Sequence, residues 1–358
     1  MARAENSGDE VSSEPPPRRA RGGSVTLRDV ARFAGVSSAT VSRVMNNPEA
    51  VSEQLRARIE VAIKHLGWVP SAAARALATQ RTGTIGAIFP TVANEHYASA
   101  IQSLQEAFEQ QGYTLLLGCS EYETDRELRQ VRKMLERGVD AFVVVGDTHR
   151  PELYPLLEQR ETPVVSTFNY SAKSHVPCVG VDNYRAFFDL TTYLLELGHR
   201  SFGMLAQSAD SNDRARARRE GVRDALAVQG LGMNPAHFVE GFWSVNEGRR
   251  LFRQVVDSPK RPTAMICGNG SFAMGAMLEA MSCGIDVPRE MTIAGFDDFE
   301  LMAELPIPIT TVRVPSVEIG RKAAEMIIAQ LDGKQVESLE FRAELIVRAS
   351  SAPPPKKR

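Results

Sequence analysis

The spacing of hydrophobic and polar positions changes near residue 83 of this 358-residue chain. Between residues 25 and 69, apolar side chains recur every three or four positions, which is the spacing of short amphipathic helices. From Thr84 onward, runs of consecutive apolar residues alternate with longer amphipathic stretches, a pattern typical of parallel sheets covered by helices on both faces. The pattern therefore predicts a small helical domain followed by a larger α/β region.

The α/β region is too long for a single sheet of ordinary size, so we expect two similar lobes. The first lobe should contain about residues 83–182 and 314–333, and the second about residues 183–310 and 334–350. The principal expected helices are 94–111, 124–137, 151–160, 184–197, 213–229, 246–257, 271–283 and 316–331. Because ligands of open parallel sheets bind at the carboxyl ends of the strands, we expect a ligand cleft between the lobes.

Residues 27–34 and 38–45 predict two short helices that flank a tight turn. Thr26 and Asp29 have the spacing of a capping box, and Gly35 stands where a left-handed residue would end the first helix. In the second helix Val41 and Val44 face inward, so small hydroxyl side chains and one arginine face outward. Such a helix fits a DNA major groove, although an ordinary helical hairpin would show the same pattern.

A third helix follows the probable cap Ser52 and packs its apolar positions on the first two, and Pro70 ends this unit. Residues 71–82 are alanine-rich and could form a hinge helix, but a helix this short is marginal in water, so a flexible linker is the alternative. Residues 1–24 are rich in Pro, Ser, Gly and charged residues, which is typical of a disordered tail, and residues 351–358 form a second tail.

The charge of the chain is distributed unevenly. Residues 25–82 hold eight Arg or Lys against four Asp or Glu, and residues 1–24 hold four of each. The net charge of −2 for the whole chain therefore leaves −6 for residues 83–358. A polyanion would bind at the N-terminal end, although chance could produce such a difference in a short segment.

The compartment is indicated by what the sequence lacks. Its four cysteines have no metal-binding spacing and lie mostly in apolar runs, so free thiols are expected. No run reaches membrane-spanning length, and the N-terminus lacks the apolar core of a signal peptide. A cytoplasmic protein with no membrane association is therefore expected.

No catalytic motif emerges from the sequence. Residues 268–275 (GNGSFAMG) resemble a phosphate loop, but their glycine spacing meets neither nucleotide motif, so a strand-to-helix turn facing the cleft is expected. The pair Asp297–Asp298 follows a strand without His or Glu at metal-ligand spacing. We expect no enzyme activity, no metal site and no cofactor.

Two features could supply a ligand site in the cleft. The run RARARRE (214–220) heads a helix and could be a solvated face, or it could place an arginine in the cleft to hold hydroxyl or carboxylate oxygens. Trp243 directly follows a strand and could stack on a sugar ring or fill the core.

These motifs together resemble the lactose repressor/purine repressor (LacI/GalR) family. The resemblance covers residues 25 to about 350, and its most specific part is the run VTLRDVARFAGVSSATVSRVMNN. It continues through GVDN, LGHR, RREGVRDAL, TAMICGN, VPREMTIAGFDD and ITTVRVP. The implied fold is an α/β protein with an N-terminal three-helix helix-turn-helix domain (25–70) and a hinge helix (71–82). A two-lobed, periplasmic-binding-protein-like effector domain of parallel sheets (83–350) follows.

The resemblance also implies DNA-binding residues. Ser38, Ala39 and Arg43 match the family's major-groove positions. The residues that match positions docking on phosphates or fixing the recognition helix are Leu27, Ser37, Thr40, Ser42 and Asn46. In the hinge, Leu77 matches a leucine wedged into the minor groove, and Ser71 and Ala74 would lie against the groove floor. Operator DNA and a second subunit would order this segment.

For the effector, the resemblance implies six residues in the cleft: Asn94, Tyr97, Arg218, Trp243, Asn269 and Asp297. Two departures stand out, because the family often has acidic residues where this chain has Gly270 and Phe168 or Asn169. Loss of two carboxylates beside a retained arginine would suit an anionic ligand such as a sugar acid. NNPEAVS and NEHY also resemble the gluconate-repressor branch.

The expected protein is thus a dimeric transcriptional regulator, most simply a repressor, whose affinity for a near-palindromic operator is controlled by a sugar or sugar acid. No leucine heptads follow the last strand, so we expect a homodimer without a tetramerising coil. The alternatives are a solute-binding protein of the same two-lobed fold and a sugar-metabolising enzyme.

Overall fold

The computed structural model describes residues 25–46, 48–69 and 81–356. The chain divides into two compact units, with the boundary between Gln80 and Arg81, and each unit is considered by itself. The predictions for the N-terminal tail and for the hinge residues Ser71, Ala74 and Leu77 lie outside the described residues.

The described residues of the first unit form three α-helices and one short 3-10 helix: α1 (Leu27–Phe33), α2 (Ser38–Asn46), η1 (Pro48–Ala50) and α3 (Glu53–Leu66). At the start of α1, the backbone N–H and the hydroxyl of Thr26 both donate to the Asp29 carboxylate, at 3.0 and 2.7 Å. Gly35 has a φ of +61°, so glycine meets the left-handed conformation that the turn between α1 and α2 requires. The core of the unit consists of Val30, Ala31, Ala34, Val41, Val44, Ile59, Ala62 and Trp68.

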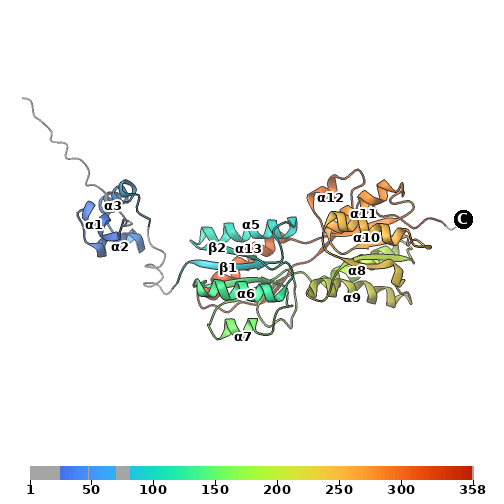
Figure 1. Ribbon diagram of the computed structural model, residues 1–358, viewed down its shortest axis with the longest axis horizontal. Coiled ribbons are helices and arrows are strands. Elements are labelled where there is room, and N and C mark those ends of the chain that lie inside the picture. Colours follow the sequence, from blue (N-terminus) through green and yellow to red (C-terminus); the bar gives the residue numbers. More distant parts are fainter. Residues whose placement is uncertain (1–24, 47, 70–80, 357–358) are drawn as a thin grey trace, which may run out of the picture. The chain divides into compact units, whose positions relative to one another are not determined.

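The first lobe of the second unit has a six-stranded sheet in the order β11-β5-β4-β3-β1-β2. All its strand pairs are parallel. Its strands are β1 (Thr84–Phe89), β2 (Thr114–Cys119), β3 (Ala141–Val145), β4 (Val164–Thr167), β5 (Cys178–Gly180) and β11 (Leu339–Glu340). Helices α5 (Glu95–Gln110) and α13 (Ser316–Leu331) cover one face, and α6 (Thr124–Glu136) and α7 (Leu153–Glu158) cover the other (Figure 1).

The second lobe repeats this arrangement with the sheet order β12-β10-β9-β8-β6-β7, in which the β10–β12 pair is antiparallel. Its strands are β6 (Phe202–Gln207), β7 (Phe238–Gly241), β8 (Ala264–Cys267), β9 (Thr292–Asp297), β10 (Thr310–Arg313) and β12 (Glu344–Ile346). One face carries α8 (Asn183–Glu196) and α9 (Asp213–Val228), and the other carries α10 (Val245–Val256) and α11 (Gly270–Ser282). The short elements η2 (Pro235–His237) and α12 (Glu300–Glu304) complete the lobe. The predicted fold class is confirmed.

The chain passes between the lobes after β5, after β10 and between β11 and β12. The last crossing corrects the sequence-based assignment of residues 334–350 to the second lobe. Leu339 and Glu340 pair with Val179 and Gly180 of β5, so β11 belongs to the first sheet and the crossing falls within residues 341–343. A strand of two residues has no periodicity of its own, so its sheet could not be inferred from the pattern.

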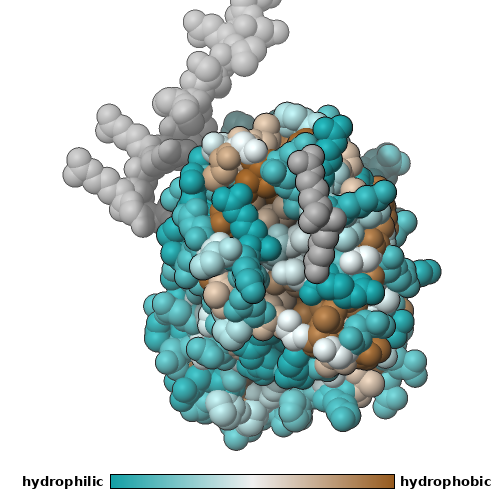
Figure 2. All heavy atoms as spheres, turned by 90° about the vertical axis from the view of Figure 1, so that its right-hand side faces the viewer, coloured by the Kyte–Doolittle hydropathy of each residue, from teal (hydrophilic) through white to brown (hydrophobic). Residues whose placement is uncertain are grey.

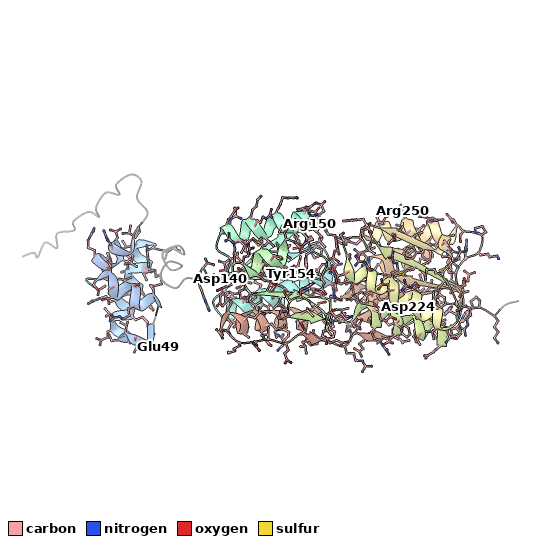
Figure 3. All side chains as sticks on the ribbon, turned by 90° about the horizontal axis from the view of Figure 1, so that it is seen from below. Glu49, Asp140, Arg150, Tyr154, Asp224 and Arg250 are labelled. Carbon is pink, nitrogen blue, oxygen red and sulfur yellow. The ribbon has the colours of Figure 1, made fainter. Side chains whose placement is uncertain are left out.

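Asp140 fixes the residues by which the chain enters the first lobe, and Figure 3 labels it at that end of the lobe. The Asp140 carboxylate accepts hydrogen bonds from the backbone N–H groups of Thr82 and Gly83, at 2.9 and 2.8 Å. These bonds fix the residues directly before β1 to the sheet. The segment that leads into the second unit is therefore anchored to the first lobe from Thr82 onward.

The outer surface of the second lobe is mostly hydrophilic, with hydrophobic patches that stay separate in this view (Figure 2). Among the described residues, no helix is both long and apolar enough to cross a membrane.

Candidate DNA interface and ligand cavity

The second helix of the first unit, α2, has one buried and one open face. Val41 and Val44 are buried in the core, whereas Ala39 and Arg43 are exposed. Ser38, Thr40 and Ser42 are half-buried at the edges of the open face. A narrow helix face of small side chains with one arginine can approach the edges of base pairs closely.

Ser37 caps α2 and sets its direction. Its hydroxyl accepts a hydrogen bond from the backbone N–H of Thr40 at 3.1 Å and lies 2.8 Å from the Thr40 hydroxyl. Leu27, also a predicted DNA contact, is half-buried at the start of α1. Asn46 is the last residue of α2, and its side chain lies outside the described part.

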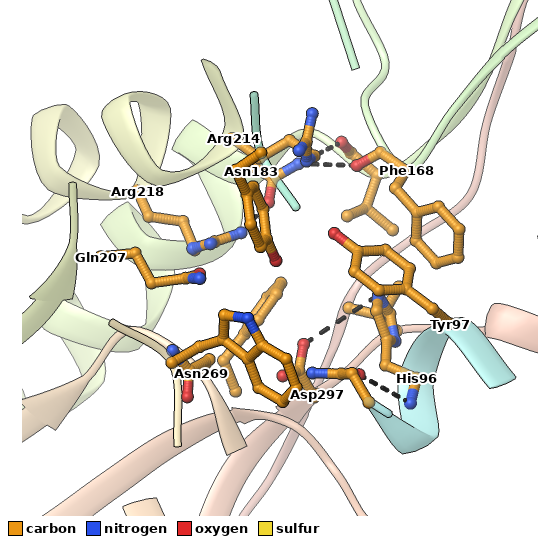
Figure 4. Close-up of a pocket in the computed structure, with 15 residues that line it drawn as sticks. His96, Tyr97, Phe168, Asn183, Gln207, Arg214, Arg218, Asn269 and Asp297 are labelled. Carbon is orange, nitrogen blue, oxygen red and sulfur yellow. Dashed lines mark hydrogen bonds and ion pairs between the residues drawn. The ribbon is translucent and has the colours of Figure 1, made fainter. Parts of the chain in front are cut away.

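A cavity lies between the two lobes of the second unit (Figure 4). The space between its lining atoms is about 420 Å³, a volume that includes open solvent at the mouth. The structure brings all six residues predicted for the effector site to this cavity. The complete lining is Asn94, His96, Tyr97, Tyr122, Phe168, Val181, Asn183, Gln207, Arg214, Arg218, Trp243, Asn269, Phe296, Asp297 and Val314.

Arg218, on α9, is the most unusual of these residues. Arg218 is buried, with only 7% of its surface exposed. Its Nη1 donates a hydrogen bond to Asn183 Oδ1 at 2.7 Å. Its Nε has no hydrogen-bond partner, and no carboxylate of the described residues lies within 4.0 Å of its nitrogens. Burial lowers the pKa of Arg218 despite the nearby Asp297 charge, so the surroundings offset only part of the cost of burying its charge.

The other cavity arginine, Arg214, is compensated. Its Nη1 lies 2.7 Å from Asp213 Oδ1 and donates across the cleft to the backbone oxygen of Val145, at 3.2 Å. Burial alone would lower the pKa of Arg214, but the Asp213 charge, together with the nearby Tyr97 and Tyr122 hydroxyls, outweighs burial and the pKa is raised. Asp213 also accepts from the backbone N–H of Asp147, at 3.2 Å. This pair therefore joins α9 to the end of β3 in the first lobe.

Asp297 and Asn269 lie at the carboxyl ends of β9 and β8. Asp297 adopts a φ of +82° and accepts a hydrogen bond from the backbone N–H of Gly270, at 3.0 Å. Asn269 caps α11 through its Oδ1, which accepts from the N–H of Phe272 at 2.8 Å, while its buried Nδ2 has no partner. The cavity thus offers one acceptor carboxylate and one unused amide donor.

Gly270, one of the two departures from the family pattern, has a steric cause. A Cβ at this position would lie 2.7 Å from the ring of Phe299, so no larger residue fits while that ring stays in place. Phe168, the other departure, lines the cavity with a φ of +64°, and its neighbour Asn169 instead donates to Asp147 at 3.0 Å. Neither position supplies a carboxylate to the cavity.

Aromatic rings form much of the remaining wall. Tyr97 and Phe168 pack edge to face at 5.0 Å in the first lobe, and the Arg218 guanidinium lies 4.9 Å from the ring centre of Phe296 in the second. Trp243 is half-buried in the turn between β7 and α10 and lines the cavity, so it is not a core residue. Flat apolar faces beside directed polar groups are the usual means of binding the two sides of a sugar-like molecule.

His96 is buried between both lobes. Its Nδ1 lies 2.6 Å from the hydroxyl of Ser316, and its Nε2 lies 4.0 Å from Asp297 Oδ1. Burial lowers the pKa of His96 despite the nearby Asp297 charge, so the imidazole is neutral at neutral pH. It therefore places no positive charge beside Asp297.

Several lining residues were not predicted from the sequence. Gln207 ends β6, so the strand-end rule that found Asp297 would also have found it. Arg214 stands four residues before Arg218 on the same helix face, a spacing that could have been used. His96, Tyr122 and Asn183 carry no such signal, because their positions depend on how distant segments approach.

A helix-turn-helix unit joined to a two-lobed ligand cavity defines the class of ligand-responsive DNA-binding regulators. Comparison with known proteins agrees and identifies the family. Residues 26–71 match the model for bacterial regulatory proteins of the lacI family, and residues 82–349 match the model for periplasmic binding proteins and the sugar binding domain of the LacI family. The chain belongs to the LacI family.

Its relatives are similar over nearly their whole length. The chain is 30% identical to the HTH-type transcriptional repressor CytR of Escherichia coli (strain K12), over 91% of this chain and 96% of that protein. It is 31% identical to the ribose operon repressor of the same strain, over 91% and 99%. The crystal structure of a LacI-family transcriptional regulator from Silicibacter pomeroyi superposes with a TM-score of 0.82 at 28% identity, over 91% and 99%. The protein is a DNA-binding transcriptional regulator, which decides against the two alternatives of a transport solute-binding protein and an enzyme.

Proposed function

We propose that this regulator is a homodimeric repressor whose affinity for operator DNA changes when a sugar acid occupies the cavity between the lobes. The main support for an acidic effector is Arg218. It is a buried cation with a free Nε and no carboxylate of the described residues within 4.0 Å. A ligand carboxylate would supply the missing charge by a charge-assisted hydrogen bond. Asn269 Nδ2 would donate to a neighbouring oxygen of the same ligand.

Each of the six predicted residues would contact a different part of the ligand. Arg218 and Asn269 would hold the acid end, and Asp297 would accept hydrogen bonds from ligand hydroxyls. Trp243 and Tyr97 would contact the apolar side of the carbon chain, and Asn94 would line the first lobe. Gluconate is the first probe to test, because it joins one carboxylate to a chain of hydroxyls and because of the likeness to the gluconate-repressor branch.

DNA would be bound through the open face of α2. Arg43 would donate to a guanine in the major groove, with Ser38 and Ala39 close to neighbouring base edges. The phosphate-docking group would be Leu27, Ser37, Thr40, Ser42 and Asn46, and Ser71, Ala74 and Leu77 would enter the minor groove. Two subunits related by a two-fold axis would require a near-palindromic operator. A protein that acts on bacterial DNA in this way would work in the cytoplasm.

A neutral sugar is the second candidate for the effector, and Asp297 favours it. A carboxylate with no cationic partner within hydrogen-bonding distance is well suited to accept from sugar hydroxyls. A neutral sugar, however, would leave the Arg218 charge uncompensated.

The test combines two measurements on the full chain. Fluorescence anisotropy with a labelled duplex from the DNA upstream of the gene reports operator binding, with and without gluconate or glucose. Calorimetry reports ligand binding directly. We expect gluconate to bind and to change operator affinity by tens of fold, the scale of a coupling of about 1–3 kcal/mol. Binding of glucose alone would reject the sugar acid, and failure to bind the duplex at any ligand concentration would reject the operator assignment.

A further inference from the structure

We infer that Asn183 positions Arg218 and keeps its charge uncompensated, so that Asn183 determines the charge of the effector that the cavity selects. This inference rests on the proposed function of the cavity as an effector site. Asn183 is the last residue of the GVDN run, but it is not among the residues to which the family resemblance assigns a role.

Asn183 is the first residue of α8, where the chain passes from the first lobe to the second. It is only 2% exposed, and both ends of its amide are engaged. Its Oδ1 accepts from Arg218 Nη1 at 2.7 Å, and its Nδ2 donates to the backbone oxygens of Phe168 and Val181, at 3.0 and 3.2 Å (Figure 4). One side chain therefore links the end of β4, the crossing segment and α9.

The two backbone oxygens dictate an amide at this position. They accept hydrogen bonds and cannot donate, so the group that faces them must carry hydrogens. The Asn183 NH₂ has two, one for each oxygen. An aspartate would pair better with Arg218 but would direct an oxygen at two oxygens, leaving Phe168 and Val181 without a donor.

The amide holds Arg218 without neutralising it. A neutral acceptor fixes the direction of the guanidinium but adds no negative charge. The rings of Phe187 and Phe296, whose centres lie 5.7 and 4.9 Å from the guanidinium carbon, add none either. Arg218 is thus aimed at the cavity with its charge available to a ligand.

The nearby charges do not remove this preference. Arg214 is occupied by Asp213, and the Asp297 carboxylate lies beyond 4.0 Å from the Arg218 nitrogens. His96 is neutral because burial lowers its pKa. Within the described lining, Arg218 is therefore the cation best placed to receive an acid.

Two variants separate charge from positioning. Asn183→Asp adds a carboxylate beside Arg218, whereas Asn183→Ala removes the side chain without adding charge. Each full-length protein is titrated by calorimetry with gluconate and with glucitol, a neutral polyol in which a CH₂OH group replaces the carboxylate. Thermal unfolding of both variants is recorded in parallel, since both lose the hydrogen bonds to Phe168 and Val181.

The wild type should bind gluconate about 10- to 100-fold more tightly than glucitol, the range of one charge-assisted hydrogen bond. Asn183→Asp should abolish this ratio by weakening gluconate binding more than glucitol binding. Asn183→Ala should weaken both ligands and keep the ratio. A purely structural role would lower both affinities equally in both variants.

The inference is overturned if Asn183→Asp keeps the wild-type ratio, or if the wild type prefers glucitol or binds neither probe. Failure of the proposed function gives a different result. In that case no acid, polyol or neutral sugar changes the affinity of the wild type for its upstream duplex. A neutral sugar that releases the duplex would overturn the charge preference and leave the ligand-controlled regulator intact.

Discussion

Replacing Arg218 by methionine should remove the response to ligand while leaving both the fold and operator binding nearly unchanged. Methionine has a similar length and can keep the packing on Phe187 and Phe296, but it carries no charge and no donor. The substitution therefore tests whether the buried guanidinium serves the ligand or the fold.

The structure sets the expected magnitudes. Loss of a charge-assisted contact to the ligand should cost about 1.5–3 kcal/mol, or about 10- to 150-fold in affinity. For stability two effects oppose each other. Removing a buried cation whose pKa burial lowers is favourable, but Asn183 Oδ1 then loses its donor, which costs about 1–3 kcal/mol. The net change in the free energy of unfolding should stay within about 1 kcal/mol.

Three measurements on one preparation show whether the Arg218 guanidinium serves ligand binding or the stability of the fold. Calorimetry gives ligand affinity, anisotropy gives operator affinity, and thermal unfolding gives stability. Arg216→Met is a matched control, because Arg216 lies on the same helix and outside the cavity lining. A normal ligand response in Arg218→Met would show that the cavity assignment is wrong. A loss of more than about 3 kcal/mol in stability would show that Arg218 is a structural residue.

Three further predictions concern other parts of the molecule. Arg43→Ala should lower specific operator affinity by about 1–3 kcal/mol and leave ligand affinity unchanged, and a uniform loss on random DNA would contradict a role in base recognition. Gly146→Ala should weaken ligand binding, because its Cβ would lie 1.6 Å from Arg214 Nη1 and would displace the arginine that joins the two lobes. Small-angle scattering that shows the same arrangement of the lobes as in the wild type would contradict this explanation. Burial alone would lower the pKa of His149, but the 2.7 Å hydrogen bond to Glu127, the Glu127 charge and the contact with the Gly146 backbone oxygen together outweigh burial and raise it. The stability from His149 should therefore be complete below pH 6.5 and be lost as pH rises through the raised pKa, and Glu127→Gln should flatten this dependence in thermal unfolding.

Much of the architecture followed from local patterns. Parallel strands buried on both faces appear as apolar runs, and the ends of such strands point to a ligand site, so Asn269 and Asp297 could be placed in the cavity from the sequence. The pattern around Arg218 fits two interpretations, because a cationic run at a helix start can equally be a solvated face. The structure distinguishes the two by burying Arg218 and leaving Arg219 partly exposed.

The missing parts depend on contacts between distant segments. Asn183 matters because Phe168 turns back over Gly180, where a Cβ would lie 2.4 Å from the backbone nitrogen of Asn169. No single stretch of sequence contains that approach. Gly270 is a similar case, since its lack of a side chain is explained only by the ring of Phe299, which lies 29 positions further on.

The strand β1 connects the cavity with the linker. Its first residue, Thr84, directly follows the Thr82–Gly83 backbone that Asp140 holds, and its last residue, Phe89, packs edge to face on Tyr97 at 5.8 Å in the cavity wall. A six-residue strand in the middle of a parallel sheet is hydrogen-bonded on both sides and cannot stretch or slide by itself. A shift of the cavity wall must therefore move Thr82 together with the whole first lobe. The ligand signal would thus reach residue 82 as a rigid-body displacement of the lobe, and no chain of side-chain rearrangements through its core is needed.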